Sequence, residues 1–167
     1  MKIQSRRLLL LVMLLAAMFA VTFEARAQQP SQPSAAKPAG ASEADLAAIK
    51  QTALDYIEGW YEGNAERMER ALHPELAKRI VNTDPKSGRS RLDQMGAMTL
   101  TQFTRAQASR PTPKDKRQSD VTVLDVFENA ASVKVVATDW VDYLHVAKFN
   151  GRWVIVNVLW ELKPQQK

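Results

Sequence analysis

The side chains best suited to chemistry lie in the last quarter of the chain. Two runs rich in β-branched and aromatic residues flank Asn150-Gly151, a dipeptide that favours a type I′ hairpin turn. In the register set by this turn, Asp142 and Asn157 share one face, with Trp140 at the same end. A carboxylate and an amide beside an indole can hold a planar heterocycle, because the indole stacks and the polar pair meets the ring's donors and acceptors. The two polar groups could instead satisfy each other or a nearby helix end.

A catalytic interpretation of the same residues makes Asp142 the candidate general base, since a carboxylate in an apolar pocket can accept a proton from a bound substrate. The chain has two histidines, His73 and His145, without the close spacing of a metal-binding helix, so no metal site is predicted. The absence of cysteine excludes a thiolate nucleophile, thiolate metal ligands and disulfides. No phosphate loop or dinucleotide fingerprint is present, and no cofactor is predicted.

The hairpin that positions these residues has two apolar faces. The turn pairs Val146 with Ile155, Leu144 with Asn157, and Asp142 with Leu159. The first face then carries Trp140, Asp142, Leu144, Val146, Trp153, Ile155, Asn157 and Leu159. The second carries Val141, Tyr143, His145, Ala147, Phe149, Val154, Val156, Val158 and Trp160. Because both faces need cover, we expect helices on one side and a second copy of the chain on the other, as a homodimer through the outer sheet face.

The elements before the hairpin indicate an α+β fold. Ser42 begins a helix with an apolar stripe from Leu46 to Trp60, and Gly63 ends it. Further helices are expected over 65–72 and from Thr99 to about Ala108, with a short strand within 76–81 between them. From Val121 onward the pattern predicts a meander of strands. Helices followed by consecutive strands predict three helices packed on an antiparallel sheet.

The N-terminal segment resembles an export signal. Residues 1–27 join a basic start to an apolar run and the small-x-small motif at Ala25–Ala27, which predicts a cleaved signal peptide and a periplasmic or secreted protein. Residues 28–41, rich in Pro, Ser, Gln and Ala, are expected to be a disordered linker. Cleavage would lower the formal net charge from +5 to +2, which argues against a nucleic-acid partner and leaves no membrane segment. The domain is expected over 42–164, with a short tail at 165–167.

The whole of this domain resembles the nuclear transport factor 2-like superfamily, and within it the lumazine-binding group of small bacterial proteins. The residues that carry the resemblance are Tyr56, Gly63, Leu72-His73-Pro74, Leu92, Asp142-Tyr143-Leu144-His145, Gly151, Trp153, Ile155, Asn157 and Trp160. The resemblance implies a cystatin-like cone, in which helices close a strongly curved sheet around a pocket. It places the Trp153–Ile155–Asn157 face on the concave side, facing that pocket.

The resemblance leaves three functions open. The first is an exported protein that binds a small ligand, a planar heterocycle of lumazine type, with Trp140, Asp142, Asn157, Tyr56 and Trp60 as the site. The second is a lyase or isomerase that uses Asp142 as its base in the same pocket. The third is a non-catalytic interaction module whose cone is filled by side chains. Because a fold does not choose among these functions, the enzyme question stays open and leans towards a binding protein.

Overall fold

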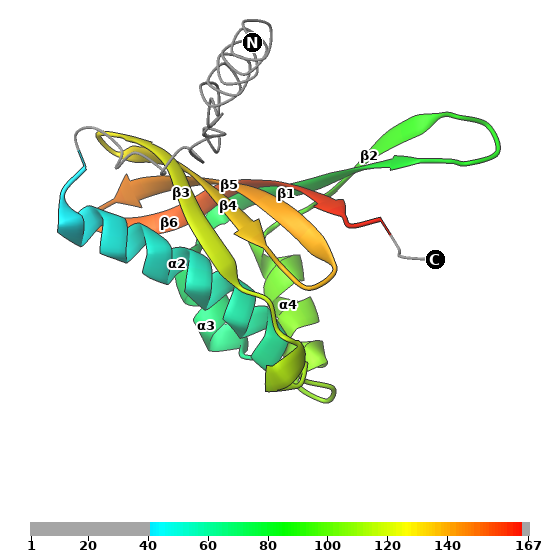
Figure 1. Cartoon of the computed structure of the whole chain (residues 1–167), viewed down its shortest axis with the longest axis horizontal. Coiled ribbons are helices and arrows are strands. Elements are labelled where there is room, and N and C mark those ends of the chain that lie inside the picture. Colours follow the sequence, from blue (N-terminus) through cyan, green and yellow to red (C-terminus); the bar gives the residue numbers. More distant parts are fainter. Residues whose placement is uncertain (1–40, 165–167) are drawn as a thin grey trace, which may run out of the picture. The chain divides into compact units, whose positions relative to one another are not determined.

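The computed structural model describes residues 41–164. The predicted signal peptide, all but the last residue of the linker and the tail at 165–167 lie outside this range. Within residues 41–164, three α-helices, a short 3₁₀ helix and six strands follow one another (Figure 1). They are α2 (Glu43–Glu62), α3 (Ala65–Ala71), β1 (Leu72–Thr83), β2 (Ser90–Met95), α4 (Ala97–Gln107), η2 (Lys114–Lys116), β3 (Asp120–Phe127), β4 (Ala130–Val136), β5 (Trp140–Phe149) and β6 (Arg152–Leu162).

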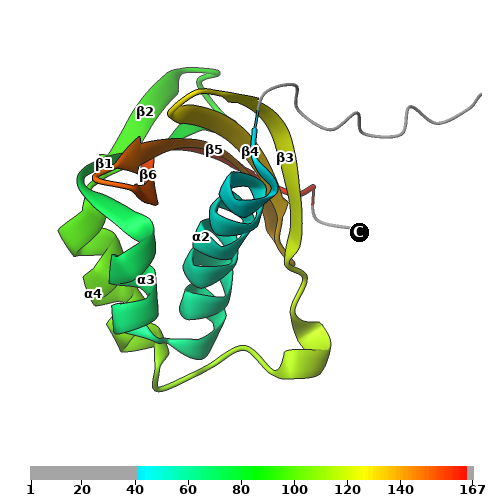
Figure 2. The same cartoon turned by 90° about the vertical axis from the view of Figure 1, so that its left-hand side faces the viewer.

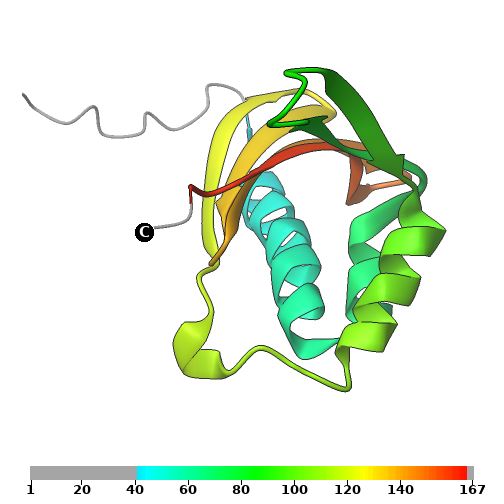
Figure 3. The same cartoon turned by 90° about the vertical axis from the view of Figure 1, so that its right-hand side faces the viewer.

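The predicted α+β class is confirmed. The strands form one sheet in the order β2-β1-β6-β5-β4-β3, which curves around α2, with α3 and α4 beside that helix (Figures 2 and 3). Neighbouring strands are antiparallel except β1 and β6, which run parallel, so the sheet is mixed where the sequence predicted antiparallel pairing throughout. The parallel pair arises because β1 follows α3 directly and lies beside the last strand. No helix within residues 41–164 is long and apolar enough to cross a membrane.

Helix α2 forms the centre of the core, as its apolar stripe predicted. Ile49, Ala53 and Ile57 are fully buried against the sheet, where Val133, Leu144, Ile155 and Val158 are also buried. Removing such an aliphatic side chain from water stabilises the fold by about 1.5–3 kcal/mol. Helix α2, packed against the concave face, therefore forms one wall of the space inside the curved sheet.

Local sequence fixes both ends of α2. Ser42 Oγ accepts a hydrogen bond from the Asp45 backbone N–H at 3.0 Å, which confirms the predicted N-terminus. At the other end Gly63 adopts a positive φ of 65°, and a Cβ there would lie 2.2 Å from the backbone of Ala108 at the end of α4. Only glycine allows this left-handed turn and this close approach of two helices.

The first turn of α2 is held on the β5–β6 hairpin by Asp45. Its Oδ1 accepts hydrogen bonds from Lys148 Nζ and Trp153 Nε1, each at 2.8 Å. Hydrogen bonds from Lys148, Trp153 and Ser42 hold the pKa of Asp45 well below its usual value. The inward placement of Trp153, predicted from the hairpin register, is confirmed by this contact and by its burial.

Two predicted boundaries are wrong. The strand expected within 76–81 is much longer, because β1 runs from Leu72 to Thr83 and pairs with both β2 and β6. Helix α4 begins at Ala97 after Gly96, which has no side-chain cap, and not at a capping box on Thr99. The earlier start follows from β2, whose last residue Met95 pairs with Lys78 and leads directly into the helix.

A β-bulge in β6 overturns half of the predicted hairpin register. The pairs nearest the turn, including Val146 with Ile155, are as predicted. The register then shifts between His145 and Val146, and Val156 becomes an extra residue, so His145 pairs with Asn157 and Asp142 with Trp160. The predicted pairs Leu144–Asn157 and Asp142–Leu159 are therefore wrong. Because side chains alternate between faces, the shift turns Val158 and Trp160 inward and Asn157 and Leu159 outward.

Candidate functional site

A cavity of about 320 Å³ lies between the concave face of the sheet and the helices. Its volume is at the small end of the ~300–1,000 Å³ typical of ligand sites, and apolar and aromatic side chains dominate its walls. The lining residues are Tyr56, Trp60, Met68, Lys78, Met95, Leu100, Phe103, Asp139, Trp140, Trp160 and Leu162. They come from α2, α3, α4, four strands and the turn before β5, so the cavity depends on the complete domain.

Four polar side chains from α2, β1 and β5 form one connected cluster beside this cavity, called here the Asp142 cluster: Tyr56, Lys78, Trp140 and Asp142. Asp142 is fully buried. Its Oδ1 accepts hydrogen bonds from Lys78 Nζ at 2.8 Å and from Tyr56 Oη at 3.1 Å. Its Oδ2 accepts from Trp140 Nε1 at 2.6 Å. Lys78 also donates to Tyr56 Oη at 2.7 Å, which closes a triangle of contacts.

Burial sets the electrostatics of the cluster. It lowers the pKa of Lys78 from its usual value of 10.5, and the neighbouring charge and hydrogen bond of Asp142 oppose that change. Burial, with the charge of Asp142 second, raises the pKa of Tyr56 well above 10, so Tyr56 stays a neutral hydrogen-bond donor. Asp142 thus accepts hydrogen bonds from three protein donors and, being fully buried, exposes no oxygen to a ligand.

Tryptophan side chains flank the polar cluster. The Lys78 ammonium lies 4.6 Å from the centroid of the Trp160 ring, within cation–π distance. Trp60 and Trp140 meet edge to face, with ring centroids 6.4 Å apart. The Nε1 of Trp160 is buried and has no hydrogen-bond partner. Burying such a donor without a partner costs about 1–3 kcal/mol, so a ligand acceptor at this indole would be stabilising.

Four of the five predicted site residues are brought together, and the fifth is not. Tyr56, Trp60 and Trp140 line the cavity, and Asp142 joins two of them. Asn157 lies on the outer face, where its Oδ1 accepts a hydrogen bond from Arg79 Nη1 at 2.7 Å. The β6 bulge causes this separation, so the predicted placement of Asn157 beside Asp142 is wrong.

Neither histidine reaches the cavity. His73 stacks on Phe149 with ring centroids 4.5 Å apart, and His145 is exposed on the outer face. Among residues 41–164, no three His, Asp or Glu side chains are grouped as a metal ion would require. The site is therefore described by its aromatic walls and its buried ion pair.

Sequence reasoning missed Lys78 and misplaced Trp160. Lys78 lies between Leu76 and Ile80 in a strand, and both neighbours are buried. Strand alternation places all three on one face, so a strand with the full length of β1 predicts that Lys78 points inward. Trp160 was assigned to the outer face because the sequence gives no sign of the bulge.

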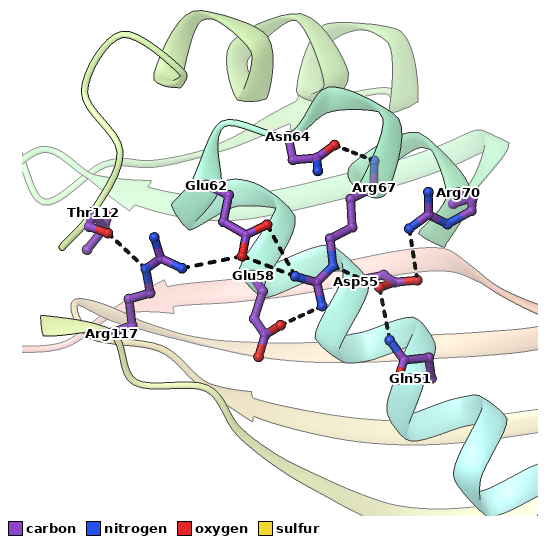
Figure 4. A network of polar contacts seen from close by, with 9 residues as sticks. All are labelled: Gln51, Asp55, Glu58, Glu62, Asn64, Arg67, Arg70, Thr112 and Arg117. Carbon is purple, nitrogen blue, oxygen red and sulfur yellow. Dashed lines mark hydrogen bonds and ion pairs between the residues drawn. The ribbon is translucent and has the colours of Figure 1, made fainter. Parts of the chain in front are cut away.

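A second charged cluster, away from the cavity, joins α2 to α3 (Figure 4). Arg67 of α3 forms ion pairs with Asp55, Glu58 and Glu62, which lie along one side of α2. Partial burial opposes ionisation, but hydrogen bonds to Asp55 and Glu58 outweigh it and raise the pKa of Arg67. Arg117 extends the cluster from Glu62 to the Thr112 carbonyl. None of these residues lines the cavity, and their contacts serve to hold the helices together.

Known proteins share both the sequence pattern and the fold. The family described as "Putative lumazine-binding" matches residues 44–161. No functionally curated protein is detectably similar to the chain. Three solved structures, each described as an NTF2-like protein of unknown function, share the fold. The protein from Methylobacillus flagellatus has a TM-score of 0.60 at 22% identity, over 76% of this chain and 98% of its own. The protein from Shewanella baltica has a TM-score of 0.58 at 17% identity, over 75% of this chain and 99% of its own. The protein from Silicibacter pomeroyi has a TM-score of 0.59 at 16% identity, over 71% of this chain and 95% of its own.

Proposed function

Because this chain belongs to the lumazine-binding family, with an NTF2-like fold, we propose that it binds a small planar heterocycle of lumazine type in its cavity. The observation that carries the proposal is the combination of aromatic walls with a buried polar cluster. An aromatic wall of Trp60, Trp140 and Trp160 suits a flat ring system. The family description concerns the family as a whole, and the ligand of this chain is our inference.

The polar groups at the cavity favour a ligand with hydrogen-bond acceptors. Lys78 has three ammonium protons, of which two are engaged by Tyr56 and Asp142. Trp160 Nε1 has no partner. Ring carbonyl oxygens such as those of lumazine can accept hydrogen bonds from such donors. The charge of Lys78 is already balanced by Asp142, so a neutral ligand needs no counter-charge.

The state of Asp142 supports binding over catalysis. A general base needs a free lone pair within reach of the substrate proton. Asp142 is fully buried and accepts three hydrogen bonds from protein donors. A lyase or isomerase with Asp142 as base would first have to break these contacts. The unfilled volume of about 320 Å³ likewise supports a ligand site over a cone filled by its own side chains.

Titration calorimetry with lumazine tests the proposal. We expect saturable binding to the wild-type protein at one site per chain. Replacing Trp60 with Leu should weaken it by about 5- to 150-fold, since stacking of a ring on an aromatic side chain contributes about 1–3 kcal/mol. The matched control is Phe127→Leu, which removes an exposed aromatic ring at the sheet edge and should leave affinity unchanged. The absence of saturable heat with lumazine and with related flat heterocycles would contradict the proposal.

We also propose that the protein is exported and that signal cleavage after Ala27 leaves Gln28 as the first residue. The support is the sequence pattern of residues 1–27, which lie outside the described part of the chain. The intact mass of the protein recovered from a bacterial periplasm measures this directly. A mass that includes residues 1–27 would contradict cleavage.

We further propose a homodimer through the outer sheet face. Tyr143 and Leu159 pair there on neighbouring strands, and each is 49% exposed. Val81 and Leu92 pair on β1 and β2 with similar exposure. Two residues predicted for this face do not belong to it, because Val158 and Trp160 turn inward after the bulge, and a third, Val154, lies on it but is buried. The apolar outer surface is therefore smaller than the sequence predicted.

A further inference from the structure

We propose that Lys78 can bind an aromatic aldehyde or ketone covalently, as an imine formed inside the cavity. This inference rests on the proposed ligand-binding role of the cavity and names a class of ligand for it. Lysine amines that are removed from water in apolar pockets are well suited to attack carbonyl carbons. Such an attack requires a neutral amine and neighbouring groups that accept and donate protons.

The position of Lys78 is unusual for a lysine. Lys78 and Asp142 are the buried charged residues within 41–164, whereas lysine is almost never buried unless it is paired. The Lys78 side chain is 8% exposed and lines the cavity. Lys78 therefore borders the space in which a ligand would lie, and its ammonium lies 4.6 Å from the centroid of the Trp160 ring and 5.4 Å from that of Tyr56.

The neighbours of Lys78 can carry the protons that imine formation moves. Asp142 Oδ1 lies 2.8 Å from Nζ and can take a proton from the ammonium, which leaves a neutral amine. Burial favours that neutral form, because it lowers the pKa of Lys78. Tyr56 Oη lies 2.7 Å from Nζ and stays protonated, and its proton, which is donated to Asp142 in the structure, can turn to the carbonyl oxygen once Asp142 has taken the ammonium proton.

The reaction balances without an oxidant or reductant. The Nζ lone pair attacks the carbonyl carbon, a C–N bond forms, and the carbonyl π electrons move to oxygen, which is protonated. The resulting carbinolamine loses its C–O bond, oxygen leaves as water, and the nitrogen lone pair forms the C=N bond. One aldehyde and one amine thus give one imine and one water, and hydrolysis returns both.

The test uses the full chain with 2-naphthaldehyde, whose imine is trapped by cyanoborohydride, and peptide mass spectrometry locates the labelled lysines. We expect Lys78 to be labelled faster at pH 7 than exposed Lys50, since burial lowers the pKa of Lys78 and so raises the fraction of its amine that is neutral. Lys50 is an internal reference, so the comparison needs no variant. An equal or slower rate at Lys78 would overturn the inference.

The unreactive analogue 2-naphthalenemethanol separates this inference from the proposed function. If it binds by calorimetry and protects Lys78 from the aldehyde, labelling occurs inside the cavity and the inference stands. If it binds but Lys78 is not labelled faster than Lys50, the imine is overturned and the binding role remains. If it does not bind and Lys78 is not labelled faster than Lys50, the imine is overturned, and the titration with lumazine decides the binding role. Lys78→Arg, which keeps the positive charge and removes the primary amine, should lose the labelling.

Discussion

At the scale of single residues, the buried ion pair is the most sensitive point of the molecule. Asp142 has no exposed surface and Lys78 has little, so neither charge is solvated by water. A buried charge that loses its partner is strongly destabilising, whereas removing both charges together can cost little. The pair therefore makes either partner difficult to replace singly.

Replacing Asp142 with Asn should lower the free energy of unfolding by about 3 kcal/mol, because it leaves the Lys78 ammonium buried and unpaired. Urea denaturation at pH 7 measures this loss. Asp115→Asn, on exposed η2, is the matched control and should change stability by less than about 0.5 kcal/mol. The double variant Asp142→Leu with Lys78→Met should recover part of the loss. If Asp142→Asn is as stable as the control, the ion pair is not a structural requirement.

Lys78 also shows what a single sequence hides at this scale. A lysine is expected at the surface, and only its environment can make it an interior residue. Leu76 and Ile80 flank Lys78 at strand spacing, but Pro74 lies just before them, and proline is disfavoured inside a strand. Pro74 is tolerated because the pairing of β1 with β6 is irregular between Leu72 and Ala77.

At the scale of elements, ion pairs on α2 and α3 compensate for the shortness of α3. A helix of seven residues has little stability of its own and depends on its contacts. Arg67 supplies them by joining Asp55, Glu58 and Glu62. The Arg67 side chain is only 17% exposed, so these pairs are less weakened by solvent than ordinary surface pairs.

Replacing Arg67 with Met should lower the free energy of unfolding by about 2 kcal/mol, since hydrogen bonds to charged groups are lost and three carboxylates are left together. Thermal or urea unfolding measures the change. Arg91→Met is the control, because the Arg91–Asp93 pair is exposed, with 77% of the arginine side chain in solvent, and should contribute under about 0.5 kcal/mol. Equal effects of the two substitutions would show that burial of the Arg67 cluster has no energetic consequence.

The helix ends and the hairpin turn were predictable because each depends on a few neighbouring residues. Ser42, Gly63 and Asn64 adopt the capping roles that their types favour, and Gly151 with Asn150 forms the positive-φ turn. The start of α4 was not predictable, since Gly96 has no capping side chain. Its position is set by the pairing of Met95 with Lys78, a contact between residues distant in sequence.

At the scale of the whole molecule, the proposed dimer accounts for the apolar residues of the outer face. Leu159→Lys places a charge at its centre, beside Tyr143. We expect this variant to be monomeric, or to shift the dimer dissociation constant by at least tenfold, by light scattering after size exclusion. Met98→Lys is the control, because Met98 is 75% exposed on α4. A wild-type monomer, or a Leu159→Lys dimer of unchanged stability, would contradict the proposal.

The overall fold was more predictable than the site. The fold class, the number of helices and the strand meander follow from periodicity and turn residues, and an error of one residue in strand register does not change them. The same error changes which side chains face the cavity. The cavity combines Tyr56 of α2 with Lys78 and Trp160, and the inward positions of the last two depend on strand length and pairing that the sequence pattern did not show.

The bulge at Val156 has a consequence for how this family of folds can change in evolution. Deletion of Val156 would restore a regular ladder and leave every later residue of β6 on its present face. Deletion of one residue at Leu159 would instead exchange the faces of those that follow and move Trp160 out of the cavity. A deletion at one position of β6 thus preserves the faces of the strand, whereas a deletion three residues later changes the wall of the cavity in a single mutational event.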